Sequence, residues 1–158
     1  MLSNKAHLMP SVLDRLADVS ESGSESDHWY DVAAMTAAIR RDLEDLLNTQ
    51  QSLPHLGIQY PELGESIMAF GVPDPTTYPL DTPAGRRRLA TALLKVIRTF
   101  EPRLSNVRVE LGSIKGEKLR ELRFRIIARL VVETEHQIVF ESNLHVPSGQ
   151  FSIDKETA

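Results

Sequence analysis

The sequence predicts an α+β fold, in which an antiparallel β-meander of three to four strands is covered on one face by two main helices plus one short helix. Three observations predict this fold. Apolar residues recur at helical spacing in the first two thirds of the chain, apolar and polar residues alternate in the last third, and short turns separate the alternating segments. Helices followed by sequential antiparallel strands are typical of two-layer α+β domains.

Composition indicates one domain of modest charge. The chain has 158 residues, 41% of them hydrophobic, and a net charge of −4, which supports one core and argues against bulk nucleic-acid or membrane binding. It has no cysteine, so disulfides and thiol catalysis are excluded. No histidine pair has metal-ligand spacing and no glycine-rich phosphate loop follows a strand, so we expect no metal and no cofactor. Without a signal-peptide core or a run of roughly 20 apolar residues, we expect a soluble, cytoplasmic protein.

Residues 1–28 are predicted to form a flexible tail with a short amphipathic segment, and residues 29–158 to form the single domain. The segment "PSVLDRLAD" places Leu13 and Leu16 at helical spacing, and a stretch rich in serine, glutamate and glycine follows it. Two interpretations stay open. The segment is either a frayed terminal turn or a peptide that docks into a partner's groove through Leu13 and Leu16.

The first main helix is predicted over residues 30–49. Its apolar stripe consists of Val32, Met35, Ile39, Leu43, Leu46 and Leu47. A long segment rich in proline and glycine follows, and within it only residues 61–70 are predicted to be helical. Pro61 would occupy the first turn of this short helix, and Gly71 would end it.

The second main helix is predicted to begin after Thr82, a good N-cap, with Pro83 at its first position. Pro102 disfavours the helical conformation for the residue before it, so we expect the helix to end at Glu101. Arg86, Arg87 and Arg88 follow closely on its start, where positive charge opposes the helix dipole. They are either solvated or a basic patch for an acidic partner surface.

Four strands are predicted over residues 105–111, 119–133, 136–146 and 151–153. On the second strand, one face carries Leu122, Phe124, Ile126, Ala128, Leu130 and Val132. The other face carries Arg123, Arg125 and Arg129, so the sheet is expected to have one apolar and one polar, basic face. His145 is expected on the polar face.

The carboxylates offer little support for catalysis. A glycosidase needs two carboxylates at a defined separation, and Glu101 with Glu110 or Glu121 is the pairing that could be proposed. No motif brings these residues together. A glycosidase is therefore the weaker alternative to a non-enzymatic protein.

Four segments occur in the order seen in one protein family: "PSVLDRLAD", "IRRDLEDLLNTQQ", "YPELGESIMAFGVPD" and "IRTFEPRLSNVRVEL". The chain resembles TssE, the baseplate subunit of bacterial type VI secretion systems, and through it the small wedge protein of contractile phage tails. The most specific elements are the triplet Glu101-Pro102-Arg103 and the run over residues 41–49. Gln50 is a departure, since the family pattern usually carries an arginine there.

The resemblance implies a structural protein that lies beside the baseplate subunits TssF and TssG. The family's phage relatives have also carried a lysozyme label, so a lysozyme-like peptidoglycan hydrolase is the alternative, which the residues do not support. The resemblance also implies that a strand edge is presented to the first ring of the contractile sheath, made of TssB and TssC. We expect the edge strand nearest a chain end, residues 151–153, to pair with a sheath strand. No nucleic acid, no direct membrane insertion and no strong homo-oligomer are expected.

The triplet is expected to present the charges of Glu101 and Arg103 to a partner, a helical bundle of neighbouring baseplate subunits. Pro102 stiffens the backbone between them, and rigid presentation lowers the ordering cost of binding. The alternative is an internal ion pair, or a contact of Arg103 with the last helical carbonyls.

Overall fold

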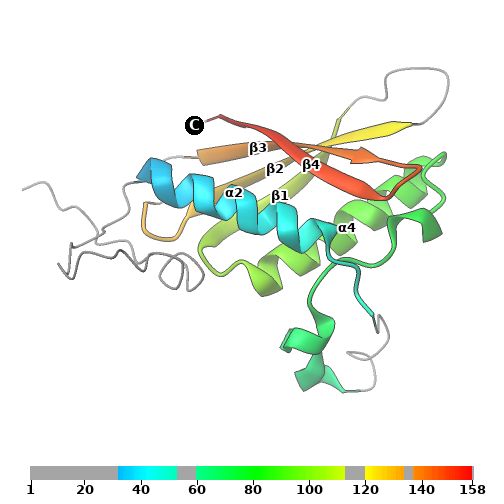
Figure 1. Ribbon diagram of the computed structural model, residues 1–158, viewed down its shortest axis with the longest axis horizontal. Helices are drawn as coiled ribbons and strands as arrows, with labels where there is room; N and C mark the ends of the chain where they lie inside the picture. The colour runs from blue at the N-terminus through cyan, green and yellow to red at the C-terminus, as the bar shows by residue number, and fades with distance from the viewer. Residues whose placement is uncertain (1–31, 53–59, 113–119, 134–136, 158) are drawn as a thin grey trace, which may run out of the picture.

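The computed structural model describes residues 32–52, 60–112, 120–133 and 137–157 and has two layers (Figure 1). Helices α2 (Val32–Asn48) and α4 (Pro83–Phe100) lie on one face of an antiparallel sheet. Its strands follow the chain in the order β1 (Leu104–Leu111), β2 (Glu121–Leu130), β3 (Gln137–His145) and β4 (Gln150–Thr157). The predicted α+β meander is confirmed, and β1 and β4 are its edges. The amphipathic segment with Leu13 and Leu16 lies outside the described residues.

A single apolar core fills the space between the two layers. Helix α4 packs against β1, and α2 packs against β4. The stripes of both helices meet the inward side chains of the sheet, and the largest fully buried side chains include Leu43, Leu93, Phe124 and Phe140. Two valines expected in this core are exposed instead, Val32 at 41% and Val132 at 46%. Val32 is the first residue of α2, and Val132 lies beyond the end of β2.

Helix α4 begins and ends where the sequence predicts. The Thr82 hydroxyl accepts a hydrogen bond from the Gly85 amide at 3.0 Å, and Pro83 occupies the first turn. At the other end, the Glu101 amide donates a hydrogen bond to the Ile97 carbonyl at 2.9 Å, and Glu101 is the C-cap residue of the helix. The local signals of Thr82, Pro83 and Pro102 therefore determine both ends of the helix.

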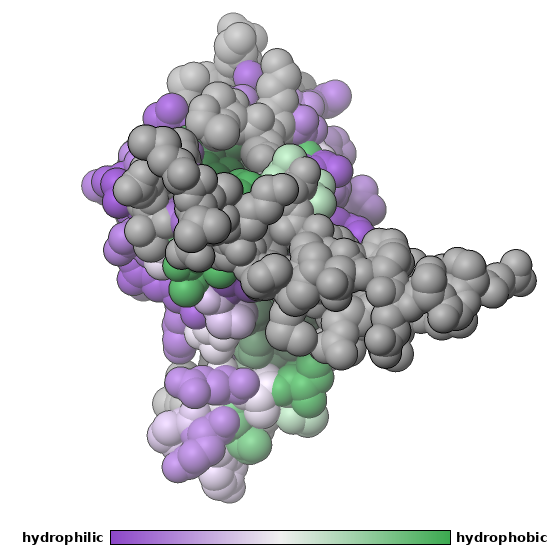
Figure 2. Space-filling view, turned by 90° about the vertical axis from the view of Figure 1, so that its left-hand side faces the viewer, coloured by the Kyte–Doolittle hydropathy of each residue, from purple (hydrophilic) through white to green (hydrophobic). Residues whose placement is uncertain are grey.

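The prediction of a single short helix over residues 61–70 is wrong. Two 3₁₀ helices, η1 (Pro61–Glu65) and η2 (Ile67–Ala69), replace it, with an extended Ser66 between them. The Ser66 hydroxyl accepts a hydrogen bond from the Met68 amide at 3.3 Å, which offers the backbone an alternative to a continuous helix. The two 3₁₀ helices project from the body (Figure 1), and apolar surface shows on this projection in Figure 2.

The segment after η2 is fastened to the end of α2. Gly71 adopts a φ of 103°, a conformation suited to glycine. The Val72 amide then donates to the Thr49 carbonyl at 2.8 Å, and the Gln51 amide donates to the Val72 carbonyl at 2.8 Å. Helix η3 (Pro75–Thr77) follows, capped by the Asp74 side chain.

The sheet face away from the helices is charged, as expected. Arg125 of β2 donates to Glu110 of β1 at 2.8 Å, and His145 is exposed. Ile127 is the exception on this face, because it is only 7% exposed. Strand β4 is longer than the predicted residues 151–153.

Candidate partner-binding surfaces

The turn between α4 and β1 holds the Glu101-Pro102-Arg103 triplet. The Leu104 amide donates to the Glu101 carbonyl at 3.2 Å, which closes the turn. The Val131 amide donates to the Arg103 carbonyl at 2.9 Å, which ties the turn to the end of β2. The backbone of the triplet is thus held from both sides.

The Glu101 carboxylate is bound by Arg103 and removed from solvent. Glu101 is 3% exposed. Arg103 Nε donates to Glu101 Oε1 at 2.6 Å, Nη2 donates to Oε2 at 2.5 Å, and the Arg103 amide donates to Oε1 at 3.2 Å. This is a bidentate guanidinium–carboxylate contact, in which each charge-assisted hydrogen bond is stronger than one between neutral groups.

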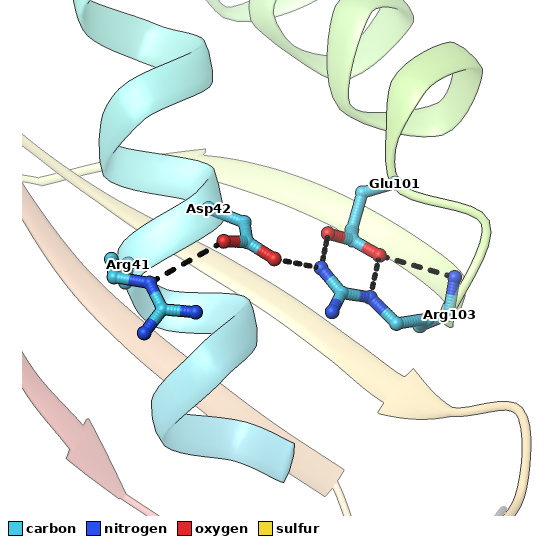
Figure 3. Close-up of polar contacts among 4 residues, drawn as sticks. All are labelled: Arg41, Asp42, Glu101 and Arg103. Carbon is cyan, nitrogen blue, oxygen red and sulfur yellow. Dashed lines mark hydrogen bonds and ion pairs between the residues drawn. The ribbon is translucent and has the colours of Figure 1, made fainter. Parts of the chain in front are cut away.

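Arg103 also reaches across to the first helix. Its Nη2 donates to Asp42 Oδ2 of α2 at 2.7 Å, and Arg41 Nε lies 3.6 Å from Asp42 Oδ1 (Figure 3). The hydrogen bond with Glu101, followed by that with Asp42, raises the pKa of Arg103 above its ordinary value. The network therefore joins the exit of α4 to the middle of α2.

The expectation that Glu101 is exposed to a partner is wrong, because its carboxylate is buried in an internal ion pair. That ion pair is the alternative the sequence left open. Pro102 is exposed and Arg103 is partly exposed, so binding of a partner by the triplet stays a prediction. Sequence reasoning did not single out Asp42, although the run over residues 41–49 contains it.

The three consecutive arginines of α4 have different surroundings. Arg86 Nη1 donates to the Leu80 and Asp81 carbonyls at 2.9 and 3.1 Å, so this side chain fastens the loop before the helix. Arg87 Nε donates to the Pro83 carbonyl at 3.3 Å. Arg88 is exposed. A role of the three residues in binding an acidic partner stays a prediction.

The β4 edge is covered by side chains of α2. Asn48 Nδ2 donates to the Phe151 carbonyl at 2.9 Å, and the Phe151 amide donates to Asn48 Oδ1 at 2.9 Å. Arg40 Nη1 donates to the Ile153 carbonyl at 3.0 Å. These contacts occupy both outward backbone groups of Phe151 and the carbonyl of Ile153, which a strand paired with residues 151–153 would need.

The β1 edge is open over part of its length. The Gly112 amide donates to the Arg123 carbonyl at 2.7 Å, which makes these residues a hydrogen-bonded pair. Such pairs alternate along an antiparallel ladder, so the backbone groups of Val109 and Leu111 point away from β2. No hydrogen bond from outside the sheet reaches them within the described residues. Two residues before Val109, the Val107 carbonyl accepts a hydrogen bond from Arg98 Nη2 at 2.8 Å.

The three carboxylates considered for hydrolysis do not converge. Glu101 is held by Arg103, and Glu110 is bonded to Arg125. Glu121 lies nine residues along β2 from Leu130, whose partner Leu104 directly follows the triplet, so Glu121 is about 30 Å along the sheet from Glu101, beyond the spacing of glycosidase pairs. Glu121 lines a polar hollow of about 980 Å³ between the end of α2 and the β3–β4 turn.

The described part of the chain contains no group of three or more histidine, cysteine, aspartate or glutamate side chains that could hold a metal ion. Neither of its α-helices is both long and apolar enough to cross a bilayer.

Comparison with known proteins identifies the family. A search of curated proteins finds no match to the chain. The family model described as baseplate wedge protein gp25 matches residues 33–135, a range that includes α4, α2 apart from its first residue, the triplet and the open edge of β1. Because this match covers more than half of the chain, the protein belongs to the baseplate wedge protein gp25 family, and its role is a structural one in a phage-tail-like baseplate.

Proposed function

We propose that this chain is the TssE-type subunit of a type VI secretion baseplate, which joins the subunits TssF and TssG and starts assembly of the TssB–TssC sheath. Membership of the wedge family and the order of the four similar segments support this assignment. The proposal places the chain at the boundary between baseplate and sheath, where it must offer two separate binding surfaces.

The open β1 edge is the observation that carries the proposal. An unpaired strand edge is a hazard, because it can pair with any other exposed strand, and proteins therefore cover or shorten such edges. Here Asn48 and Arg40 bond the β4 backbone at Phe151 and Ile153, whereas Val109 and Leu111 keep their backbone groups free of bonds from outside the sheet in the described chain. A partner strand can add to β1 through main-chain hydrogen bonds. We assign this edge to the sheath.

The triplet supports the second surface. The Arg103 side chain is 26% exposed, and its Nη1 atom bonds none of the described residues (Figure 3). Glu101 and Asp42 hold the guanidinium in a fixed orientation, so a partner that binds Nη1 need not order it. We assign this exposed edge of Arg103, with the neighbouring Pro102, to TssF and TssG.

Proline at the β1 edge tests the sheath assignment. Val109→Pro and Leu111→Pro each remove an outward-pointing amide donor without removing a bond to β2. Each purified variant is first checked by thermal melting. We expect cells that carry either variant to form few fluorescent TssB-labelled sheaths, while affinity capture of TssF and TssG continues.

The matched control is Val132→Pro, because Val132 is an exposed valine outside the strands. It should leave sheath number unchanged. Normal sheath assembly by folded Val109→Pro and Leu111→Pro proteins would show that this edge does not receive a sheath strand. Failure of the wild-type chain to capture TssF and TssG would contradict the assignment to this baseplate.

A further inference from the structure

A hollow of about 420 Å³ opens beside a β-bulge in β1, next to the open edge. Its lining includes Arg98, Asn106, Arg108, Ile127, Arg129 and Gln137. Arg108 lies opposite Ile127 in the ladder, and Ile127 and Arg129 share the sheet face away from the helices. The hollow therefore lies at the edge of the sheet, where residues of the charged face meet Arg98 of the helix layer.

The bulge brings three elements together at this place. Asn106 and Val107 of β1 oppose Ala128 alone, and Asn106 adopts a φ of 52°, which asparagine tolerates. The displaced Val107 carbonyl is then reached by Arg98 from α4. Arginines from α4, β1 and β2 thus line one hollow.

These arginines have no acidic partner in the described part of the chain. None of the ion pairs found there involves Arg98, Arg108 or Arg129, and no carboxylate lines the hollow. By contrast, Arg125 on the same face is paired with Glu110 at 2.8 Å. In a chain of net charge −4, the hollow is a local concentration of positive charge that attracts an anion.

The floor of the hollow adds an apolar component. Ile127 lies between the charged side chains and is 7% exposed. A glutamate side chain matches this arrangement, since its methylene groups can cover Ile127 while its carboxylate meets the guanidinium groups. A small inorganic anion would leave the apolar floor unused.

The hollow adjoins the point where strand addition must stop. A strand paired with Val109 and Leu111 needs two more residues, about 7 Å, to reach Val107. There the carbonyl is already occupied by Arg98, which has further N–H donors to offer. Main-chain pairing ends at this position, and the next side chain of the incoming strand lies beside the guanidinium groups.

We infer that this hollow binds the carboxylate of an acidic residue, glutamate above all, at the end of the protein strand that adds to the β1 edge. The inference rests on the proposed use of that edge. Binding sets the register of the incoming strand, because main-chain hydrogen bonds alone do not distinguish registers that differ by two residues.

Charge reversal tests the inference. The full chain carrying both Arg108→Glu and Arg129→Glu is compared with the wild type and with a control variant, Arg123→Glu. Arg123 is an exposed arginine on the same strand and the same face as Arg129. Melting curves establish that all three proteins are folded. The probe is a displayed library of random ten-residue peptides selected on the wild-type chain, so no knowledge of the natural partner is needed.

We expect selection to enrich peptides with aspartate or glutamate near one end. Their affinity should fall by about tenfold or more for the double variant, and by no more than about twofold for the control. Added salt should weaken wild-type binding. Enrichment of neutral or basic peptides, equal affinity for the double variant, or binding of a single-stranded oligonucleotide in place of peptides would overturn the inference.

Capture of the TssB–TssC complex separates this inference from the proposed function. Loss of capture with both Val109→Pro and the double variant supports both. If Val109→Pro loses capture but the double variant keeps it, the edge is used and the hollow is not. That result overturns the inference about the hollow and leaves the proposed function standing. If the wild type captures no sheath complex, the proposed function fails, and the peptide selection alone decides the role of the hollow.

Discussion

Replacing Glu101 by alanine should destabilise the fold, which is the reverse of what an exposed docking residue would do. The change removes a carboxylate that is 3% exposed and accepts three hydrogen bonds from Arg103. The partly exposed guanidinium keeps its bond to Asp42 at 2.7 Å, so it is not left without a partner. The cost should therefore lie near the lower end of the range for breaking a buried ion pair, at about 3 kcal/mol.

For a chain of this length, that loss corresponds to a melting temperature lowered by about 6–12 °C. Glu101→Gln should fall between the alanine variant and the wild type, because it keeps the shape and one acceptor but loses the charge. Glu110→Ala is the matched control. Its ion pair with Arg125 has the same chemistry, but the two side chains are 45% and 54% exposed, and its loss should cost about 0–1 kcal/mol.

The assay is thermal melting of the three variants beside affinity capture of TssF and TssG by the same preparations. A Glu101→Ala melting curve that coincides with that of Glu110→Ala would refute the argument that burial makes this ion pair a fold element. Unchanged stability together with lost capture would instead show that the triplet is a docking site.

Three further predictions concern other contacts. Gly85→Ala should destabilise α4 by about 1–3 kcal/mol despite alanine's higher helix propensity, because a Cβ there would lie 2.0 Å from the Pro79 carbonyl oxygen; a melting temperature above that of the wild type would contradict this. Asn48→Ala should cost about 1–3 kcal/mol and expose the β4 edge, so sedimentation velocity should detect self-association that the wild type does not show. Hydrogen bonds from Thr76 and then from Gln50 hold the pKa of Asp74 below 3.8, so its ionised form stabilises the fold above about pH 4 and this contribution is lost as the pH falls. Gln50→Arg should lower this pKa further, which NMR titration of the carboxyl group can measure; an unchanged pKa would exclude the contact.

The parts of the fold that the sequence predicts well depend on local chemistry. Helix α4 is correct at both ends because Thr82, Pro83 and Pro102 act on their immediate neighbours. The strands are correct in number and order because their alternation has a period of two. The split of residues 61–70 into two 3₁₀ helices was not predicted, because the Ser66 side chain competes with the helical hydrogen bonds and the apolar pattern does not report this.

The candidate surfaces depend on pairs of residues that are far apart in the sequence, and these were missed. The Glu101–Arg103 ion pair is local and was left open by the sequence, but the contact of Arg103 with Asp42 of α2 joins the turn to a residue 61 positions earlier. Closure of the β4 edge requires Asn48 and Arg40, whose side chains look like ordinary polar residues of α2 until the packing of α2 against β4 is known. Periodicity identifies the two edges of a meander, but it does not indicate which of them a helix will cover.

The two edges together suggest how one chain can accept a strand without pairing with itself. Helix α2 covers the β4 edge at Phe151 and Ile153, and the bulge with Arg98 shortens the open part of β1 to the stretch around Val109 and Leu111. Two copies that paired through this stretch would each bring Arg108 and Arg129, which have no acidic partner in the described chain, close to the other copy's strand. Like charges at such an interface cost free energy, whereas an acidic strand would gain it. The same arginines would then disfavour a homodimer and favour the partner, so that affinity and specificity arise from one group of side chains.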